Sequence, residues 1–280
     1  MIAIRACCGL DELEACVQLQ IETWGYDRTD VLPRKSFLLA QKIGGQVIGA
    51  FETERNGAKP EGGPESLVGF VMAWPGVKTG GVAGDGSLDK APLPGCADGS
   101  PRGYLHSHML AVREGYRNRG LGGRLKLAQR AEALGRGIRH MEWTFDPLEI
   151  KNAYLNIRKL GAVVRRYEVD FYGVSSSPLQ GGLPTDRLVA EWELDSARVE
   201  AALDGRLAAP VPEETILMRI EVPASIYEWK ASEAGRERAL AVQLENRRAF
   251  LDAFAQGLAV VGFSLDSKGN GTYELSRQSA

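Results

Sequence analysis

The chain has 280 residues, 44% of them hydrophobic, which is enough for a full core in one large domain or two smaller ones. A net charge of -2 gives no general attraction to nucleic acid or to anionic membranes, so neither is expected as a partner. The four cysteines have no C-x-x-C spacing and there are three histidines, so we expect a reduced, cytoplasmic protein with neither a metal site nor a disulfide framework.

The N-terminal region predicts a strand followed by two helices. Residues 2–5 are typical of a short strand, and residues 10–23 of a helix with apolar side chains on one side. A second helix is predicted from Pro33, a residue favoured in the first turn, to a stop at Gly44. No apolar run in this region is long enough for a signal peptide or a membrane span.

Two strands and a long loop are predicted next. Residues 46–53 and 66–74 are typical of strands, joined by a Gly- and Pro-rich loop at 56–65. Residues 75–103 contain eight glycines and four prolines without periodic apolar positions, and they predict a second loop. Such a loop is either an insertion or a flap over a site, and its composition favours the insertion.

A glycine-rich segment with the sequence RNRGLGGR, at 117–124, lies between a predicted strand at 104–112 and a helix that ends near Gly135. Glycines allow a ligand to approach the backbone closely, and the free amides at the start of a helix attract phosphate groups. The glycines alone are equally typical of a surface turn. The strand before them and the helix after them favour a phosphate site.

Basic residues are concentrated around this segment. Residues 113–139 hold eight Arg and Lys against two Glu, which suits a polyanionic ligand. A solvated helix face is the alternative explanation, and we expect it to hold Lys126, Arg130 and Arg136.

The segment LAVREGYRNRGLGGRLKLAQ at 110–129 resembles the CoA-binding segment of the GNAT superfamily of CoA-dependent N-acyltransferases, whose pattern is [RQ]-x-x-G-x-[GA]. The resemblance implies an α/β fold with a mixed sheet, and acetyl-CoA or another acyl-CoA as co-substrate, without a metal. The residues that it implies for cofactor binding are Leu110, Ala111, Val112, Arg117, Asn118, Arg119, Gly120, Leu121, Gly122, Gly123, Arg124 and Asn152. The predicted opening order of strand, helix, helix, strand, strand is also that of GNAT domains.

The elements after the glycine-rich segment complete such a core. A strand at 141–145, a helix that ends at Gly161, and strands at 163–172 and 188–194 are predicted. We therefore expect a GNAT-like catalytic domain at 1–195 that includes the insertion at 75–103.

The remaining residues, 196–280, predict an α+β extension. They contain a strand at 215–222, a capping-box spacing at Ser225 and a hairpin at 258–275. One helical face is expected to carry Leu240, Leu244, Leu251 and Phe254. These apolar faces must be buried on the core or across a homodimer.

Two residues are candidates for proton transfer. His108 stands four residues before Val112, where many GNAT proteins carry a base, and a histidine that titrates near neutral pH suits that role. Alternation is expected to place it on one side of its strand with His106, Leu110 and Val112. A histidine hydrogen-bonded within the sheet is the alternative.

The position of the usual GNAT acid, a tyrosine, holds Ile157. Tyr154 lies one turn earlier and is the substitute candidate, although it is equally typical of a core aromatic. Asn152 and Asn156 suit either hydrogen bonds to the cofactor or helix capping.

The segment Thr185-Asp186-Arg187 is a candidate acceptor-binding corner, because arginine pairs with carboxylates through two parallel hydrogen bonds. A structural ion pair at Asp186 is the alternative.

The function expected is direct acyl transfer, most simply of acetyl, to the amine of a small molecule such as an amino acid. Succinyl-CoA is an alternative donor, and a non-catalytic CoA-binding or scaffold protein is the alternative class.

Overall fold

A computed structural model describes residues 1–53, 63–78, 101–205 and 211–277. The elements of the N-terminal half are β1 (Ile2–Ala6), α1 (Gly9–Trp24), α2 (Arg34–Lys42), β2 (Gln46–Glu52), β3 (Leu67–Lys78), β4 (Arg102–Val112) and α3 (Leu121–Gly135). Those of the C-terminal half are β5 (His140–Phe145), α4 (Ile150–Ala153), the π-helix η3 (Tyr154–Lys159), β6 (Val163–Glu168), β7 (Arg187–Glu193), α5 (Ala197–Leu203), β8 (Met218–Val222), α6 (Ile226–Ala231), α7 (Arg236–Ala255), β9 (Leu258–Leu265) and β10 (Gly271–Arg277).

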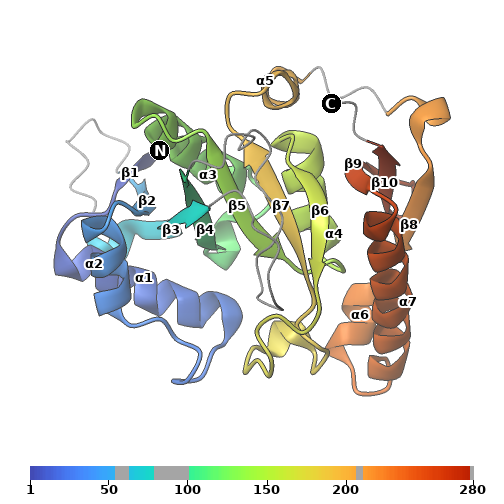
Figure 1. The fold of residues 1–280 in the computed structure, drawn as a ribbon. Coiled ribbons are helices and arrows are strands. Elements are labelled where there is room, and N and C mark those ends of the chain that lie inside the picture. The colour runs from blue at the N-terminus through green and yellow to red at the C-terminus, as the bar shows by residue number, and fades with distance from the viewer. Residues whose placement is uncertain (54–62, 79–100, 206–210, 278–280) are drawn as a thin grey trace.

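All ten strands form one sheet in the order β1-β2-β3-β4-β5-β7-β6-β9-β10-β8. The pair β4 and β5 is parallel, and the other pairs are antiparallel. The predicted mixed sheet is therefore present, and Figure 1 shows α3 and α1 on opposite sides of its strands.

Strands β2 and β3 are buried on both faces. Val47 and Met72 pack with α1 and α2 in one apolar cluster, whereas Ile48 and Val71 pack with Leu125 of α3 in another. This alternation explains why these strands consist almost entirely of apolar residues.

The C-terminal segment continues the same sheet. Strand β9 pairs with β6 at Val164 and Val260, and one apolar cluster includes residues from β5, β7, α7 and β10. Arg198 on α5 donates hydrogen bonds to the carbonyls of Gly161 and Val261. The division into residues 1–195 and 196–280 stays a prediction, and in the structure both segments contribute strands to one sheet.

Several predicted element boundaries, one helix cap and one buried helix face were wrong. Residues 75–78 extend β3 and 102–103 begin β4, whereas residues 79–100 of the predicted insertion lie outside the described residues. The strand predicted at 163–172 ends at Glu168, and Ser225 makes no capping hydrogen bond to α6. In α7, Leu244 and Leu251 are exposed, because the face with Ala239, Gln243, Asn246, Phe250 and Ala253 is the buried one.

Within the described segments, no helix is both long and apolar enough to cross a bilayer, and no group of His, Cys, Asp and Glu side chains is arranged to hold a metal ion. Cys7, Cys8 and Cys16 are free thiols. The cytoplasmic location stays a prediction.

Candidate functional site: a phosphate cradle beside two diverging strands

The glycine-rich segment folds as a turn that leads directly into α3. Gly120, the residue before the helix, has a left-handed conformation with φ 75°, and Asn118 has φ 59°. No side chain caps the helix, and its first backbone hydrogen bond runs from the Arg124 amide to the Gly120 carbonyl, 3.1 Å. The amides of residues 121–123 therefore point out of the helix without an intrahelical partner.

The glycines keep the start of the helix bare. A Cβ atom added at Gly120 would meet nothing within 4 Å, and one added at Gly122 would lie 3.5 Å from the Leu110 side chain. The Leu155 side chain of η3 comes within 3.7 Å of a Cβ added at Gly123. The free amides thus lie beside β4 on one side and η3 on the other.

Three arginines, at positions 117, 119 and 124, belong to the same segment as these amides. Arg117 donates from Nε to the Val112 carbonyl (2.9 Å), and Arg124 donates to the Ile2 carbonyl (3.1 Å). The Arg119 guanidinium lies 5.8 Å from the centre of the Tyr116 ring. In the described part of the chain none of the three forms an ion pair with a carboxylate. Arg117 lines a pocket together with Glu114, so Arg119 and Arg124 carry the positive charge that is available to a phosphate group.

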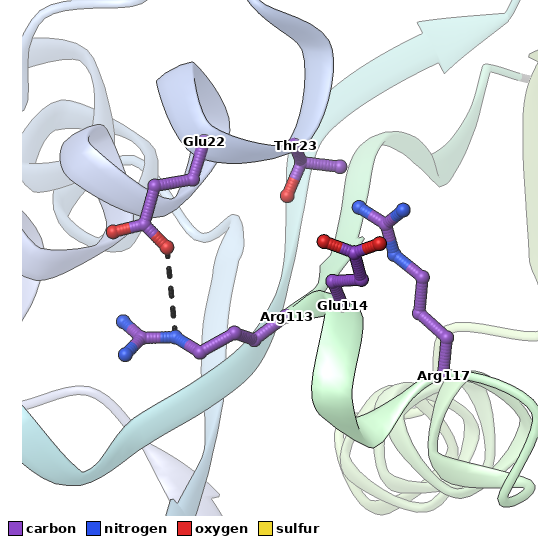
Figure 2. A pocket seen from close by; sticks show the side chains of 5 residues that line it. All are labelled: Glu22, Thr23, Arg113, Glu114 and Arg117. Carbon is purple, nitrogen blue, oxygen red and sulfur yellow. Dashed lines mark ion pairs between the residues drawn. The ribbon is translucent and has the colours of Figure 1, made fainter.

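A polar pocket of about 420 Å³ opens between the end of α1 and the segment that follows β4. Figure 2 shows its lining residues, Glu22, Thr23, Arg113, Glu114 and Arg117. The Nε atom of Arg113 lies 3.5 Å from a Glu22 carboxylate oxygen, and the buried Thr23 hydroxyl has no hydrogen-bond partner among the described residues. Two arginines and two glutamates leave the pocket with balanced charge. The pocket lies next to the turn and helix start at residues 117–124, which we call the cradle.

Strand β4 separates from β5 just before the cradle. The described ladder between them joins Leu105 to Met141 and His106 to Glu142, and it does not continue to the end of either strand. On its other edge β4 stays paired with β3 as far as Val112. Apart from the Val112 carbonyl, which accepts from Arg117, the backbone of residues 107–112 therefore keeps one open edge that a ligand with amide groups can pair with.

His108 forms a bulge in β4. Met109 pairs with Met72 and Ser107 pairs with Ala73, so His108 has no counterpart on β3. The predicted alternation was wrong because of this bulge. Leu110 and Val112 pack with the α3 cluster, whereas the His108 ring lies beside that of His106, with 6.2 Å between the ring centres.

The His108 ring is neutral at neutral pH. Burial, and to a smaller extent the neighbouring His106, lowers the pKa of His108 to about 4. The imidazole therefore keeps a free lone pair at pH 7, although it is a weaker base than a histidine that titrates near neutrality.

His106 borders a network of charged groups on β3, β5, β6 and β7. Its Nδ1 lies 3.8 Å from Glu142, which also pairs with Lys78 and with Arg166, the latter at 2.7 Å. Burial of Glu142 is outweighed by these hydrogen bonds and positive charges, which hold its pKa well below the usual range. Glu142 is thus a fixed negative charge close to His106.

The chain matches no protein-family model and no curated protein. It does resemble solved structures. Arabidopsis thaliana NAA60 in complex with acetyl-CoA aligns with a TM-score of 0.50 and 16% identity over 70% of this chain and 100% of that one. The chain has the fold of the GNAT acetyltransferases.

Two further solved structures align over a similar share of the chain. The ribosomal-protein-S18-alanine N-acetyltransferase from Escherichia coli has a TM-score of 0.46 and 14% identity over 70% of this chain and 96% of that one. A protein from Desulfovibrio desulfuricans described as belonging to the GNAT family has a TM-score of 0.46 and 11% identity over 69% of this chain and 99% of that one.

The remaining candidates near the glycine-rich segment lie on α4 and η3. Asn152 is exposed on α4, one turn before Leu155, while Asn156 is buried. The Tyr154 ring packs against the core cluster, 5.6 Å from the Lys159 amine, and Ile157 is fully buried. Because residues 154–159 form a π-helix, Tyr154 does not lie above Ile157 as it would in an α-helix.

The predicted acceptor-binding corner contains one structural residue, Asp186, and one arginine, Arg187, that is not in an ion pair within the described segments. Asp186 is fully buried and pairs with Arg247 of α7. Arg187 donates to the Asp186 carbonyl and to Gln180, and its guanidinium lies 5.2 Å from the centre of the Tyr172 ring. Among the described residues it has no carboxylate partner.

Aromatic side chains lie near Arg187. Trp24 and Tyr26 are stacked with 5.6 Å between their ring centres, and the Tyr172 hydroxyl is 2.9 Å from that of Thr144 on β5. The segment after α1 is held against the segment before β7, because Ser176 donates to Asp30 and Ser177 donates to the Trp24 carbonyl. Arg187 and these rings thus lie on the side of the sheet that carries α1.

Lys126, which was predicted to lie on a solvated helix face, is buried. The residue is 3% exposed, and its amine contacts Ser107 on β4 and the Trp143 ring on β5. The place of Lys126 directly after the apolar position Leu125 was the one signal of burial in the sequence. Its contact with Ser107 on β4 could not be predicted from the sequence.

Proposed function

We propose that the protein transfers an acyl group from acyl-CoA directly to the amine of a small molecule. The observation that supports this most strongly is the uncapped start of α3, with free amides and unpaired arginines, at the end of a strand whose neighbour has diverged. The GNAT fold agrees with this reading, since solved neighbours carry acetyl-CoA or CoA.

The described residues suit an acyl-CoA. The amides of residues 121–123, with Arg117, Arg119 and Arg124, would bind the pyrophosphate. The open edge of Leu110, Ala111 and Val112 would pair with the amides of the pantetheine arm, and the exposed Asn152 is placed to add a further hydrogen bond. Bound there, the co-substrate supplies an activated thioester.

His108 would accept the proton that the amine loses as it attacks. Its neutral ring keeps a lone pair, and the bulge sets it beside the opening between β4 and β5. Tyr154 remains the tyrosine candidate for the acid, although its ring packs against the core.

Arg187 would hold a carboxylate of the acceptor, with Tyr26 and Tyr172 beside it. The absence of a carboxylate partner for this arginine among the described residues favours an acceptor such as an amino acid. Acetyl is the simplest donor group and succinyl the alternative. A cytoplasmic location and a homodimer belong to the same proposal.

A thermal-shift series with CoA, acetyl-CoA, succinyl-CoA and ATP tests the cofactor. A ligand at a hundredfold over its dissociation constant stabilises by about 2.7 kcal/mol, so a shift of several degrees is expected with the CoA compounds and none with ATP. Release of free CoA thiol with a panel of amines and amino acids then tests transfer. Binding without transfer to any amine would favour the non-catalytic CoA-binding class, and no shift would favour the scaffold.

A further inference from the structure

Lys126 lies at the point where β4 and β5 begin to diverge. Its amine donates a hydrogen bond to the Ser107 hydroxyl (2.7 Å) and lies 3.5 Å from the centre of the Trp143 ring. The last described rung between the strands joins His106 to Glu142, so Ser107 and Trp143 are the first residues beyond it. The amine therefore bridges the apex of the opening from the side of α3.

This lysine is buried without a counter-charge. It is 3% exposed, and no carboxylate in the described segments pairs with it. Burial places the pKa of Lys126 well below that of an ordinary lysine. The amine can therefore gain and lose a proton at a pH where an exposed lysine stays charged.

The distance along β4 places this amine at the reacting end of the proposed co-substrate. From Val112, next to the cradle, to Ser107 the strand rises five residues, or about 16 Å. That length is comparable to an extended pantetheine arm. A thioester whose pyrophosphate occupies the cradle thus ends near Ser107, between Lys126 on one side of the sheet and His108 on the other.

No tyrosine occupies the position expected of an acid. Ile157 stands there and is fully buried, and Tyr154 packs against the core. Lys126 instead reaches the opening between β4 and β5 from α3, through its contacts with Ser107 and Trp143. In its protonated form it has three donor hydrogens, one of which is used by Ser107.

We propose, on the basis of the proposed function, that Lys126 is a catalytic residue that gives a proton to the departing CoA thiolate. The nitrogen of the acceptor amine attacks the thioester carbonyl carbon, and His108 takes the proton that this nitrogen loses. The carbonyl then re-forms as the C–S bond breaks, and the sulfur, which keeps the bonding pair, receives a proton from the Lys126 ammonium. Return of the proton from His108 to Lys126 through solvent restores both groups, so no proton is gained or lost overall.

The first test needs no acceptor. The thiol of CoA bound to the wild-type protein is titrated by its thiolate ultraviolet absorbance, and the titration is repeated with Lys126→Met, which keeps the volume and the contact with Trp143. A Lys126 ammonium beside the sulfur should lower the thiol pKa by about one unit or more relative to the variant. Equal thiol pKa values in the two proteins would overturn the proposal. Lys159→Met, the same change at an exposed lysine, is the matched control and should titrate as wild type.

Kinetics provide the second test. Lys126→Met should lower kcat roughly a hundredfold or more while leaving KM for acyl-CoA and the thermal shift with CoA nearly unchanged. With an aryl thioester, whose leaving thiolate needs no proton, the loss should shrink to a few-fold. A loss of the same size with both donors would contradict a proton-donor role. If the wild-type protein binds CoA but transfers to no amine, the proposed function fails. The thiol titration still shows whether the Lys126 ammonium lies beside the CoA sulfur.

Discussion

Asp186 and Arg247 join the core of the sheet to the C-terminal helix α7 through two parallel hydrogen bonds. The Nε and the terminal nitrogen of Arg247 each lie 2.8 Å from a different oxygen of the Asp186 carboxylate. The carboxylate is fully buried and also accepts hydrogen bonds from the Tyr167 hydroxyl (2.6 Å) and the Asp170 amide (3.0 Å). Asp186 is therefore committed to structure, which leaves its neighbour Arg187 available for a ligand.

Replacement of Asp186 by Asn should destabilise the protein. The change removes the charge that pairs with Arg247 and turns one acceptor oxygen into a donor, so we expect a loss of about 3 kcal/mol in the free energy of unfolding. Urea unfolding would measure it. Arg187→Gln is the matched control and should change stability by less than about 1 kcal/mol. Equal losses in the two variants would mean that the pair does not hold α7 to the sheet.

The same Arg187→Gln variant tests acceptor binding. Its KM for an amino acid acceptor should rise roughly tenfold or more, because a charged hydrogen-bonded pair is lost, while KM for acyl-CoA stays the same. The decarboxylated amine should be used equally well by variant and wild type. If the variant prefers the amino acid over its decarboxylated amine as strongly as the wild type does, Arg187 does not contact the carboxylate.

The cradle can be tested by filling it. Gly122→Val places a branched side chain beside the free amides at the start of α3, and the space around Gly122 tolerates its Cβ, so folding should survive while the thermal shift with CoA disappears. Gly135→Ala, at the far end of the same helix, is the control, because nothing lies within 4 Å of an added Cβ there. It should stabilise the helix slightly and keep the full shift. Normal CoA binding by Gly122→Val would show that the cradle does not bind CoA.

The buried neutral His108 should make stability depend on pH. Its folded pKa of about 4 lies below the ordinary value of 6.5, so between these values the unfolded chain binds more protons. The free energy of unfolding therefore falls as the pH drops from 6.5 to 4, by roughly 3 kcal/mol from this residue. His108→Gln removes the contribution, and unfolding curves of both proteins at several pH values would show it. Parallel pH profiles would mean that the His108 ring is solvated.

Local properties of the sequence predicted the glycine turn and the helix start that follows it. The turn depends on a left-handed residue at Gly120 and on an uncapped helix start, and both are set by a few adjacent residues. The sheet class followed from apolar runs such as 46–52, which are buried on both faces.

Features that depend on a neighbouring strand could not be predicted in this way. The bulge at His108 exists only in the register between β3 and β4, and it reverses which side chains share a face. Pro75 and Gly76 are loop-like in composition, yet pairing with β4 keeps them in β3. Lys126 is buried because Ser107 and Trp143 lie beneath it, and both come from other segments of the chain.

The continuation of the sheet from β6 into β9 determines how copies of the protein could associate. Strand β6 lies between β7 and β9, so neither of its edges is an outer edge of the sheet. In the described structure the two outermost strands are β1 and β8. A dimer built by joining sheets edge to edge would have to use one of these two strands, both of which lie several strands away from the opening between β4 and β5.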